Sequence, residues 1–327
     1  MHIIKNLYDG QLACVHTEKG NSEWFSLGQG VRQGCILSPT LFNMYAEYIM
    51  RNALNDWNGG LSIGGWQLSN LRYADDTTLL TTTLEDLQCV LEKVKLESEA
   101  MGLRLNVAKT KIMIIGGVQP TDPLMVDGKE VEQITQFNFL GALITTDGSC
   151  KQEIRRRLTM ARSAMANLST IWADRGVTKA TKVRLVRALV FPIATYSCET
   201  WSLTKADRDR INAFELWCWR KMLKIPWVAK RTNISVLHDI GVKNRLLDSV
   251  NRQTLSYFGH IARRQDNCLE KVLMQGKIEG SRRRGRPRAR WMDRIKNLTG
   301  QPLTGVYKLA ADRQQWRAIL KVTNCQT

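Results

Sequence analysis

The sequence lacks the features that would direct a chain to a membrane or out of the cell. No apolar run approaches the roughly 18 residues that a membrane-spanning helix needs. The first residues, MHIIKN, do not resemble a signal peptide. The eight cysteines include no CxxC pair, which favours reduced, buried thiols over a disulfide framework. We therefore expect no membrane partner and a location in the nucleus or the cytoplasm.

Zinc-binding motifs are also missing. In the second half of the chain, cysteines and histidines have spacings that match no common set of zinc ligands. The residues concerned are Cys198, Cys218, His238, His260 and Cys268. A zinc site made from them stays open as a minor alternative.

Acidic residues are scarce in the second half. The formal net charge is +18, but residues 1–150 hold 11 basic and 17 acidic side chains, whereas residues 151–327 hold 37 and 13. Such an excess of cations favours a polyanionic partner, because binding releases condensed counterions. Nucleic acid is therefore the expected partner. An anionic membrane surface is the weaker alternative, since the basic segments carry no face of bulky apolar anchors.

Hydrophobic periodicity predicts alternating strands and helices in the first half and mainly helices in the second. Ser38-Pro39 predicts a helix start with Ser38 as the cap, and Thr83 with Asp86 predicts another. A β-hairpin is expected around residues 71–80. The other predicted strands are 103–106, 111–115 and 137–144, and the predicted helices are 38–54, 83–102, 154–172, 178–191, 206–224 and 244–264.

The turn of that hairpin contains two adjacent acids, Asp75 and Asp76, after Tyr73 and Ala74. Neighbouring carboxylates repel one another unless a cation or strong hydrogen-bond donors compensate. Mg²⁺ prefers such hard oxygen ligands, and substrate phosphates complete its octahedron in polymerases. The alternative is an Asp-rich turn that simply faces solvent.

Four segments around this turn form a pattern. They are GVRQGCILSPTLF from Gly30, YADD from Tyr73, GLRLNVAKTK from Gly102 and FNFLG from Phe137. In this order and spacing they resemble motifs B, C, D and E of reverse transcriptases of the non-LTR retrotransposon (LINE) type. The resemblance covers the C-terminal part of such an enzyme and implies RNA-directed DNA synthesis with Mg²⁺, an RNA template and a DNA primer or target.

The resemblance also implies a role for residues of motifs C and D. Asp75 would be the principal metal ligand and Asp76 the secondary one, while Tyr73 would pack beneath the primer end. Lys109 would lie near the departing pyrophosphate, where an ammonium donates a proton or offsets charge. Lys111 is expected to be a solvated lysine at a strand end.

In motif B, the resemblance places Gln33 and Gly34 next to the template and the incoming base pair. Gly34 has no side chain, so a strand can approach its backbone, and Gln33 can donate and accept hydrogen bonds there. Gly34 is also expected to form the bend before the helix that starts at Ser38.

The family's first catalytic aspartate, in motif A, has no counterpart in this chain. In the family this motif lies several tens of residues before motif B, and its carboxylate bridges both metal ions. The acids that precede Gly30 are Asp9, Glu18 and Glu23. Asp9 is expected in an Asp-Gly turn and stays a minor candidate for replacing the missing ligand. We therefore expect motif A and the fingers to be absent, and polymerase activity to be weak or lost.

Beyond residue 150, arginines project from a predicted helix that resembles the thumb of this family. Arg155, Arg156 and Arg157, with Lys151 and Arg162, are expected to contact phosphates without reading sequence. The alternative is a solvated helix face. Four tryptophans occur at helical spacing: Trp201, Trp217, Trp219 and Trp227. Each is either a core residue or an aromatic surface on which nucleic-acid bases stack.

The densest basic run is SRRRGRPRAR, from Ser281 to Arg290. So many arginines do not pack into a core, and they require solvent or a polyanion. Arg284, Gly285, Arg286 and Pro287 resemble an AT-hook, which lies in a narrow minor groove. A nuclear-localisation signal uses the same residues, and both interpretations stay open.

Taken together, the residues and the resemblance predict an α+β fold. It comprises a partial right-hand polymerase palm, an antiparallel sheet with helices, followed by a mainly α-helical thumb and a C-terminal extension. The expected boundaries are residues 1–118 for the palm, 119–150 for the motif E grip, 151–240 for the thumb and 241–327 for the basic extension. Two alternatives remain: a non-catalytic nucleic-acid-binding remnant and an intron-maturase-like RNA-folding factor.

Overall fold

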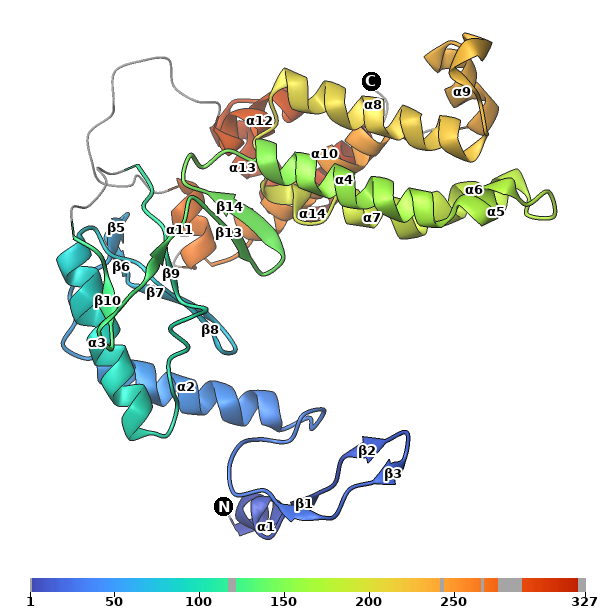
Figure 1. The fold of residues 1–327 in the computed structure, drawn as a ribbon. Coiled ribbons are helices and arrows are strands. Elements are labelled where there is room, and N and C mark those ends of the chain that lie inside the picture. The colour runs from blue at the N-terminus through green and yellow to red at the C-terminus, as the bar shows by residue number, and fades with distance from the viewer. Residues whose placement is uncertain (1, 117–121, 242–243, 266–267, 276–289, 323–327) are drawn as a thin grey trace. The chain divides into compact units, whose positions relative to one another are not determined.

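Figure 1 shows the fold of the chain in a computed structural model, which describes residues 2–116, 122–241, 244–265, 268–275 and 290–322. The chain divides into two compact units. One comprises residues 1–61 and 67–107, and the other comprises residues 62–66 and 108–327. Helices combine with small sheets, which is compatible with the predicted α+β class. Among the described residues, no helix is long and apolar enough to cross a membrane.

The first unit begins with a short helix and two small antiparallel strand pairs. These are α1 (His2–Tyr8), β1 (Leu12–Ala13) with β4 (Phe25–Ser26), and β2 (His16–Thr17) with β3 (Gly20–Asn21). Next come α2 (Ser38–Leu54), the hairpin of β7 (Asn70–Tyr73) and β8 (Asp76–Leu79), and α3 (Leu84–Ala100). Strands β5 (Leu61–Ile63) and β6 (Trp66–Leu68) lie between α2 and β7 in the sequence, and residues 62–66 of this stretch belong to the second unit.

The two long helices of this unit start where the sequence predicted, but only one has the predicted cap. The Thr83 hydroxyl accepts a hydrogen bond from the amide of Asp86 at 3.1 Å and caps α3. In α2 the cap position is Leu37, so the prediction that Ser38 caps this helix is wrong. Ser38 already lies inside the helix, because Pro39 fits the first turn. Its hydroxyl instead contacts the Tyr8 hydroxyl at 3.2 Å.

Helices α2 and α3 pack against each other through a small apolar cluster of Met50, Ala53 and Val94. Leu79 of β8 is partly buried against the same cluster. Apolar burial therefore holds the open end of the β7–β8 hairpin on the helix pair.

The second unit opens with short strands. Strand β9 (Lys111–Ile112) pairs in parallel with β12 (Glu132–Gln133), and β10 (Met125–Val126) pairs with β11 (Lys129–Glu130). The predicted strand at 103–106 is wrong, because these residues have no regular structure, and the strand predicted at 111–115 ends at Ile112.

A single strand over residues 137–144 is also wrong. The structure has a hairpin of β13 (Gln136–Phe139) and β14 (Ala142–Thr145). The turn residues Leu140 and Gly141 have φ of +47° and +82°. Two successive positive φ values match the right-handed twist of a two-residue hairpin.

The rest of the second unit is helical (Figure 1). Its α-helices are α4 (Lys151–Asn167), α5 (Ser169–Ala173), α6 (Lys179–Leu185), α7 (Phe191–Ala194), α8 (Lys205–Met222), α9 (Asn233–Ile240), α10 (Leu246–Ala262), α11 (Leu269–Gln275), α12 (Trp291–Thr299), α13 (Leu303–Ala311) and α14 (Arg313–Val322). A π-helical turn, η1 (Val186–Val190), joins α6 to α7, and η2 (Cys198–Thr200) and η3 (Trp227–Ala229) are 3₁₀ turns. The helix predicted at 154–172 breaks at Leu168, and α9 was not predicted.

Two apolar cores support these helices. The larger one joins α4, α7 and α8, and includes Leu158, Phe214 and the buried Trp219. The smaller one joins α10 to α12–α14 around Phe258 and Trp316. Trp201 and Trp219 are therefore core residues, one of the two roles considered for them.

Candidate active site

The acidic turn lies at the tip of a hairpin, as predicted. Tyr73 pairs with Asp76 as the last pair of the β7–β8 ladder, and Ala74 adopts a left-handed conformation with φ of +53°. Asp75 and Asp76 are both exposed. Among the described residues, none forms a hydrogen bond or an ion pair with either carboxylate. The repulsion between the two charges is therefore left for solvent or a cation to offset.

The donor set at this turn fits a magnesium ion. Two adjacent carboxylates supply hard oxygen ligands, and Mg²⁺ commonly takes one or two of these and fills its other positions with water or phosphate. Within the part of the chain that the structure describes, no group of three or more His, Cys, Asp or Glu side chains is placed to hold a metal. The turn thus offers two protein ligands and depends on others for the rest.

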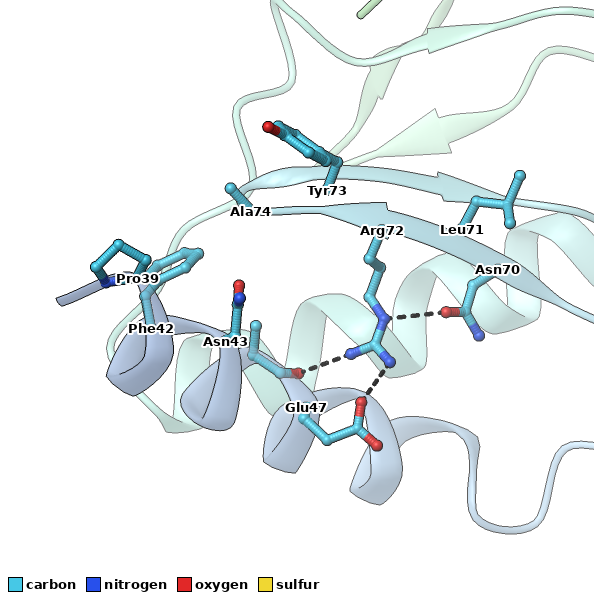
Figure 2. Close-up of a pocket in the computed structure, with 10 residues that line it drawn as sticks. Pro39, Phe42, Asn43, Glu47, Asn70, Leu71, Arg72, Tyr73 and Ala74 are labelled. Carbon is cyan, nitrogen blue, oxygen red and sulfur yellow. Dashed lines mark hydrogen bonds and ion pairs between the residues drawn. The ribbon is translucent and has the colours of Figure 1, made fainter. Parts of the chain in front are cut away.

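A pocket of about 570 Å³ lies between helix α2 and strand β7, next to the turn. Figure 2 shows the side chains around it, with α2 on one side and the hairpin on the other. The lining residues are Pro39, Phe42, Asn43, Ala46, Glu47, Asn70, Leu71, Arg72, Tyr73 and Ala74.

Arg72 crosses this pocket. Its guanidinium donates hydrogen bonds to the Asn70 side chain at 3.1 Å, to the Ala46 carbonyl at 3.3 Å and to the Glu47 carboxylate (Figure 2). Glu47 also accepts a hydrogen bond from Arg51, one turn along α2, at 2.7 Å. The hydrogen bonds from Arg51 and then Arg72 lower the pKa of Glu47 below its ordinary value. Sequence reasoning missed this contact, because it joins residues 25 apart in the chain.

The motif B residues Gln33 and Gly34 lie in the exposed turn before α2. Gly34 has φ of +83°, and a Cβ added there would meet no other atom within 4 Å. The left-handed backbone therefore accounts for a glycine at this bend, and the space above it is open to a ligand.

Lys109, the motif D candidate, is exposed. It lies in a turn over residues 107–109 and belongs to the second unit.

The arginines of α4 have different environments. Arg155 is exposed and forms no ion pair with a described residue. Arg157 is only 6% exposed, so the prediction that it contacts phosphates is wrong. Arg156 is partly exposed and bonds to Glu153 and to the Gly141 carbonyl.

Glu153 is the centre of this internal network. Its carboxylate, 3% exposed, accepts hydrogen bonds from the Leu143 amide at 3.1 Å and from Arg156 and Arg157 at 2.8 and 2.7 Å. Arg157 also donates to the Gly141 carbonyl and lies over the ring of Tyr196. The network therefore ties the β13–β14 turn to helix α4.

Arg162 is an exposed arginine on the same helix, and its guanidinium lies 5.8 Å from the ring centre of the half-buried Trp217. It forms no ion pair with a described residue. A guanidinium near an aromatic ring can still bind a phosphate, because its N–H donors point outward in the plane of the guanidinium. Arg284, Gly285, Arg286 and Pro287, the AT-hook or nuclear-localisation candidates, lie outside the described residues.

The cysteines considered for zinc are dispersed. Cys198 is buried and donates to the Gln253 side chain at 2.7 Å, and burial raises the pKa of its thiol to about 12. Burial also raises the pKa of Cys218. Among the described residues, these cysteines and histidines form no group of three or more that could hold a metal ion.

Comparison with known proteins finds similarity to one family. Residues 1–144 match the family of reverse transcriptases (RNA-dependent DNA polymerases). A putative uncharacterized transposon-derived protein of Caenorhabditis elegans is 26% identical over 80% of this chain and 98% of its own length. Residues 1–144 of this chain are therefore similar to a reverse transcriptase domain.

Further relatives come from retrotransposable and mobile elements. The Pol polyprotein of the type-1 retrotransposable element R2 from Nasonia vitripennis is 29% identical over 45% of this chain and 15% of the polyprotein. The RNA-directed DNA polymerase of the mobile element jockey from Drosophila funebris is 20% identical over 71% of this chain and 26% of its own length. The matched stretches are thus similar to parts of proteins from non-LTR retrotransposons, and the chain spans about a quarter or less of these two relatives.

Proposed function

We propose that this chain is the part of a non-LTR reverse transcriptase that holds the primer end and a catalytic Mg²⁺, and that it binds template–primer duplex along its helical half. The observation that carries this proposal is the exposed Asp75–Asp76 pair at the hairpin tip, which no described residue neutralises. Residues 1–118 act as palm, 119–150 as the grip, 151–240 as thumb and 241–327 as a basic extension.

Each residue then has a defined task. Asp75 and Asp76 hold Mg²⁺, which when bound lowers the pKa of the primer hydroxyl and neutralises triphosphate charge. Tyr73, whose exposed ring stands beside the turn, packs beneath the primer end. Gln33 and Gly34 face the template and the incoming base pair. Lys109 offsets charge on the pyrophosphate.

Along the helical half, phosphates are bound by the exposed arginines of α4. Arg155 and Arg162 have no described acidic partner and therefore keep their full charge for a ligand. One edge of the Arg156 guanidinium bonds to Glu153. Arg156 therefore donates to a phosphate only with the opposite edge. In the basic extension, the residues from Arg284 to Pro287 bind target DNA or element RNA.

The isolated chain should polymerise weakly. Two-metal nucleotidyl transfer uses carboxylates that bridge both ions, and within the described residues no third acid joins Asp75 and Asp76. A second candidate function, nucleic-acid binding without catalysis, is favoured by the net charge of +18. An intron-maturase-like role has no separate support.

A primer-extension assay on poly(rA)/oligo(dT) with Mg²⁺ separates these functions. We expect slow extension by the intact chain, loss of extension in Asp75→Asn, and no change in Asp56→Asn, which removes an exposed acid of the same unit far from the turn in sequence. Duplex affinity should be equal in all three proteins. Extension that survives Asp75→Asn would refute the metal assignment. Equal, salt-sensitive binding without extension in any of them would favour the non-catalytic function.

A further inference from the structure

The β7–β8 hairpin needs a fixed position if its acidic turn is to hold a metal at a defined place. A two-stranded hairpin alone is marginally stable in water. Leu79 fixes the open end through the apolar cluster of α2 and α3. Near the turn, however, the pocket of about 570 Å³ separates β7 from α2, so apolar packing does not hold this end.

Arg72 spans the pocket at this end. It precedes Tyr73 in β7, and because side chains alternate along a strand, Arg72 points toward α2 while Tyr73 points to the opposite side of the hairpin (Figure 2). Its guanidinium reaches two successive residues of α2, the Ala46 carbonyl and the Glu47 carboxylate. It also bonds to Asn70 of its own strand, which fixes the direction of the side chain.

The chemistry of this contact favours arginine. The planar guanidinium donates to acceptors in several fixed directions at once, whereas a lysine ammonium is a flexible point charge. Glu47 is prepared for the contact, because Arg51 binds its Oε1 atom and leaves Oε2 for Arg72.

The exposure of the pair argues that its effect is local. The Arg72 and Glu47 side chains are 27% and 42% exposed. Ion pairs this exposed contribute little to global stability. Their main effect is therefore on where the hairpin lies relative to α2.

We propose that Arg72 is a positioning residue, which through Glu47 holds the Asp75–Asp76 turn at a fixed distance from helix α2 and from the motif B turn that precedes it. The catalytic part of this assignment rests on the proposed function. Arg72 touches no reacting atom and acts through the backbone of the strand that leads to the turn.

Arg51 provides a matched control. It bonds to the same carboxylate as Arg72 but lies on α2, with its side chain 77% exposed, and among the described residues it forms no hydrogen bond or ion pair with the hairpin. Arg51→Met and Arg72→Met therefore each remove one cationic partner of Glu47. Only Arg72→Met releases the hairpin.

Amide hydrogen exchange tests the contact directly. In Arg72→Met the amides of β7 and β8 should exchange about threefold or more faster than in the parent chain, with little change in α3 or in melting temperature. Arg51→Met should leave the hairpin amides unchanged, and Arg72→Lys should restore part of the protection. Unchanged hairpin exchange in Arg72→Met, or equal effects in both methionine variants, would overturn the proposal. If Arg72→Met does not fold, Glu47→Gln replaces it and should show the same acceleration.

Mn²⁺ provides a second readout that separates this proposal from the metal assignment. Mn²⁺ bound at the turn should broaden amide signals at the start of α2 in the parent chain and in Arg51→Met, and broaden them less in Arg72→Met. Asp75→Asn should abolish the broadening in every background. If the parent chain shows no Asp75-dependent broadening, the metal assignment fails, while the exchange rates still decide whether Arg72 holds the hairpin. Equal broadening in Arg51→Met and Arg72→Met would refute the positioning role.

Discussion

Cys35 and Cys198 carry the same thiol, but their surroundings shift its pKa in opposite directions. Cys35 lies in the motif B turn, where a backbone hydrogen bond from Leu37, hydrogen bonds from Ser38 and the charge of Arg32 lower its pKa. Burial raises the pKa of Cys198 to about 12. The fraction of reactive thiolate at neutral pH is therefore much larger at Cys35.

We predict that Cys35 is alkylated at least about 100-fold faster than Cys198 at pH 8. Timed reaction with iodoacetamide, digestion and mass spectrometry give the rate at each cysteine. Cys89, an exposed thiol of α3, serves as the reference for access alone. Template–primer duplex should slow the reaction at Cys35 and not at Cys89. Equal rates at Cys35 and Cys198 would contradict the prediction.

The arginines of α4 show what the sequence could and could not predict about single residues. Three successive helical residues point about 100° apart, so Arg155, Arg156 and Arg157 cannot share one surface. Arg157 lies on the side of the buried Ile154 and Ala161. Glu153, four residues before Arg157, was the available signal for an internal ion pair. The contacts with Gly141 join separate elements and have no local signal.

At the scale of elements, the β13–β14 hairpin and helix α4 behave as one piece because the Glu153 network joins them. Burial alone would raise the pKa of Glu153, but hydrogen bonds from Arg156, Arg157 and the Leu143 amide outweigh it and lower the pKa. The Tyr196 hydroxyl adds a hydrogen bond to the Leu140 carbonyl at 2.8 Å. The β13–β14 turn is therefore held by helix α4 and by the turn that follows α7.

Glu153→Gln should destabilise the chain by about 3 kcal/mol, because it leaves the buried Arg157 without a counter-charge. Urea unfolding measures this loss, and Arg155→Ala, at the exposed neighbour, should change stability by less than about 0.5 kcal/mol. A carboxyl group whose pKa is lower in the folded state than in the unfolded state stabilises the fold at pH values above the unfolded-state pKa. This stabilisation is lost as the pH falls through the folded-state pKa. The difference between Glu153→Gln and the parent chain should therefore shrink below about pH 4. A difference that is independent of pH would contradict the ionic role.

Helix ends were predictable where a cap identifies them, and strands were less predictable. Thr83 with Asp86 and Pro39 mark helix starts with local chemistry. The hairpin at Leu140-Gly141 carries no Asn-Gly or Asp-Gly signal, so the alternation of apolar residues looked continuous. Residues 103–106 have strand-like composition but no partner strand. A segment becomes a strand only if it pairs with another strand, and that partner can lie far away in the sequence. Local sequence therefore does not encode the pairing.

At the scale of the whole molecule, charge and chemistry are separated along the chain. The acidic turn lies in the half with 11 basic and 17 acidic side chains, and the phosphate-binding candidates lie in the half with 37 and 13. The basic second half of the chain would attract an anionic substrate. The reacting end of that substrate would need a bound cation at the acidic turn in the first half. Affinity for duplex should therefore depend on salt through the helical half and only weakly on the acids of the turn.

Measurement of duplex affinity between about 50 and 200 mM salt tests this division. Each arginine that neutralises a phosphate contributes about 0.9 to the slope of log K against log salt on B-form duplex. Arg155→Ala and Arg162→Ala should each lower the slope by nearly that amount, and together by roughly twice as much. The double variant Asp75→Asn/Asp76→Asn should leave the slope unchanged, because these acids release no phosphate counterions. Unchanged slopes in both arginine variants would mean that α4 presents a solvated face and that the duplex lies elsewhere on the chain.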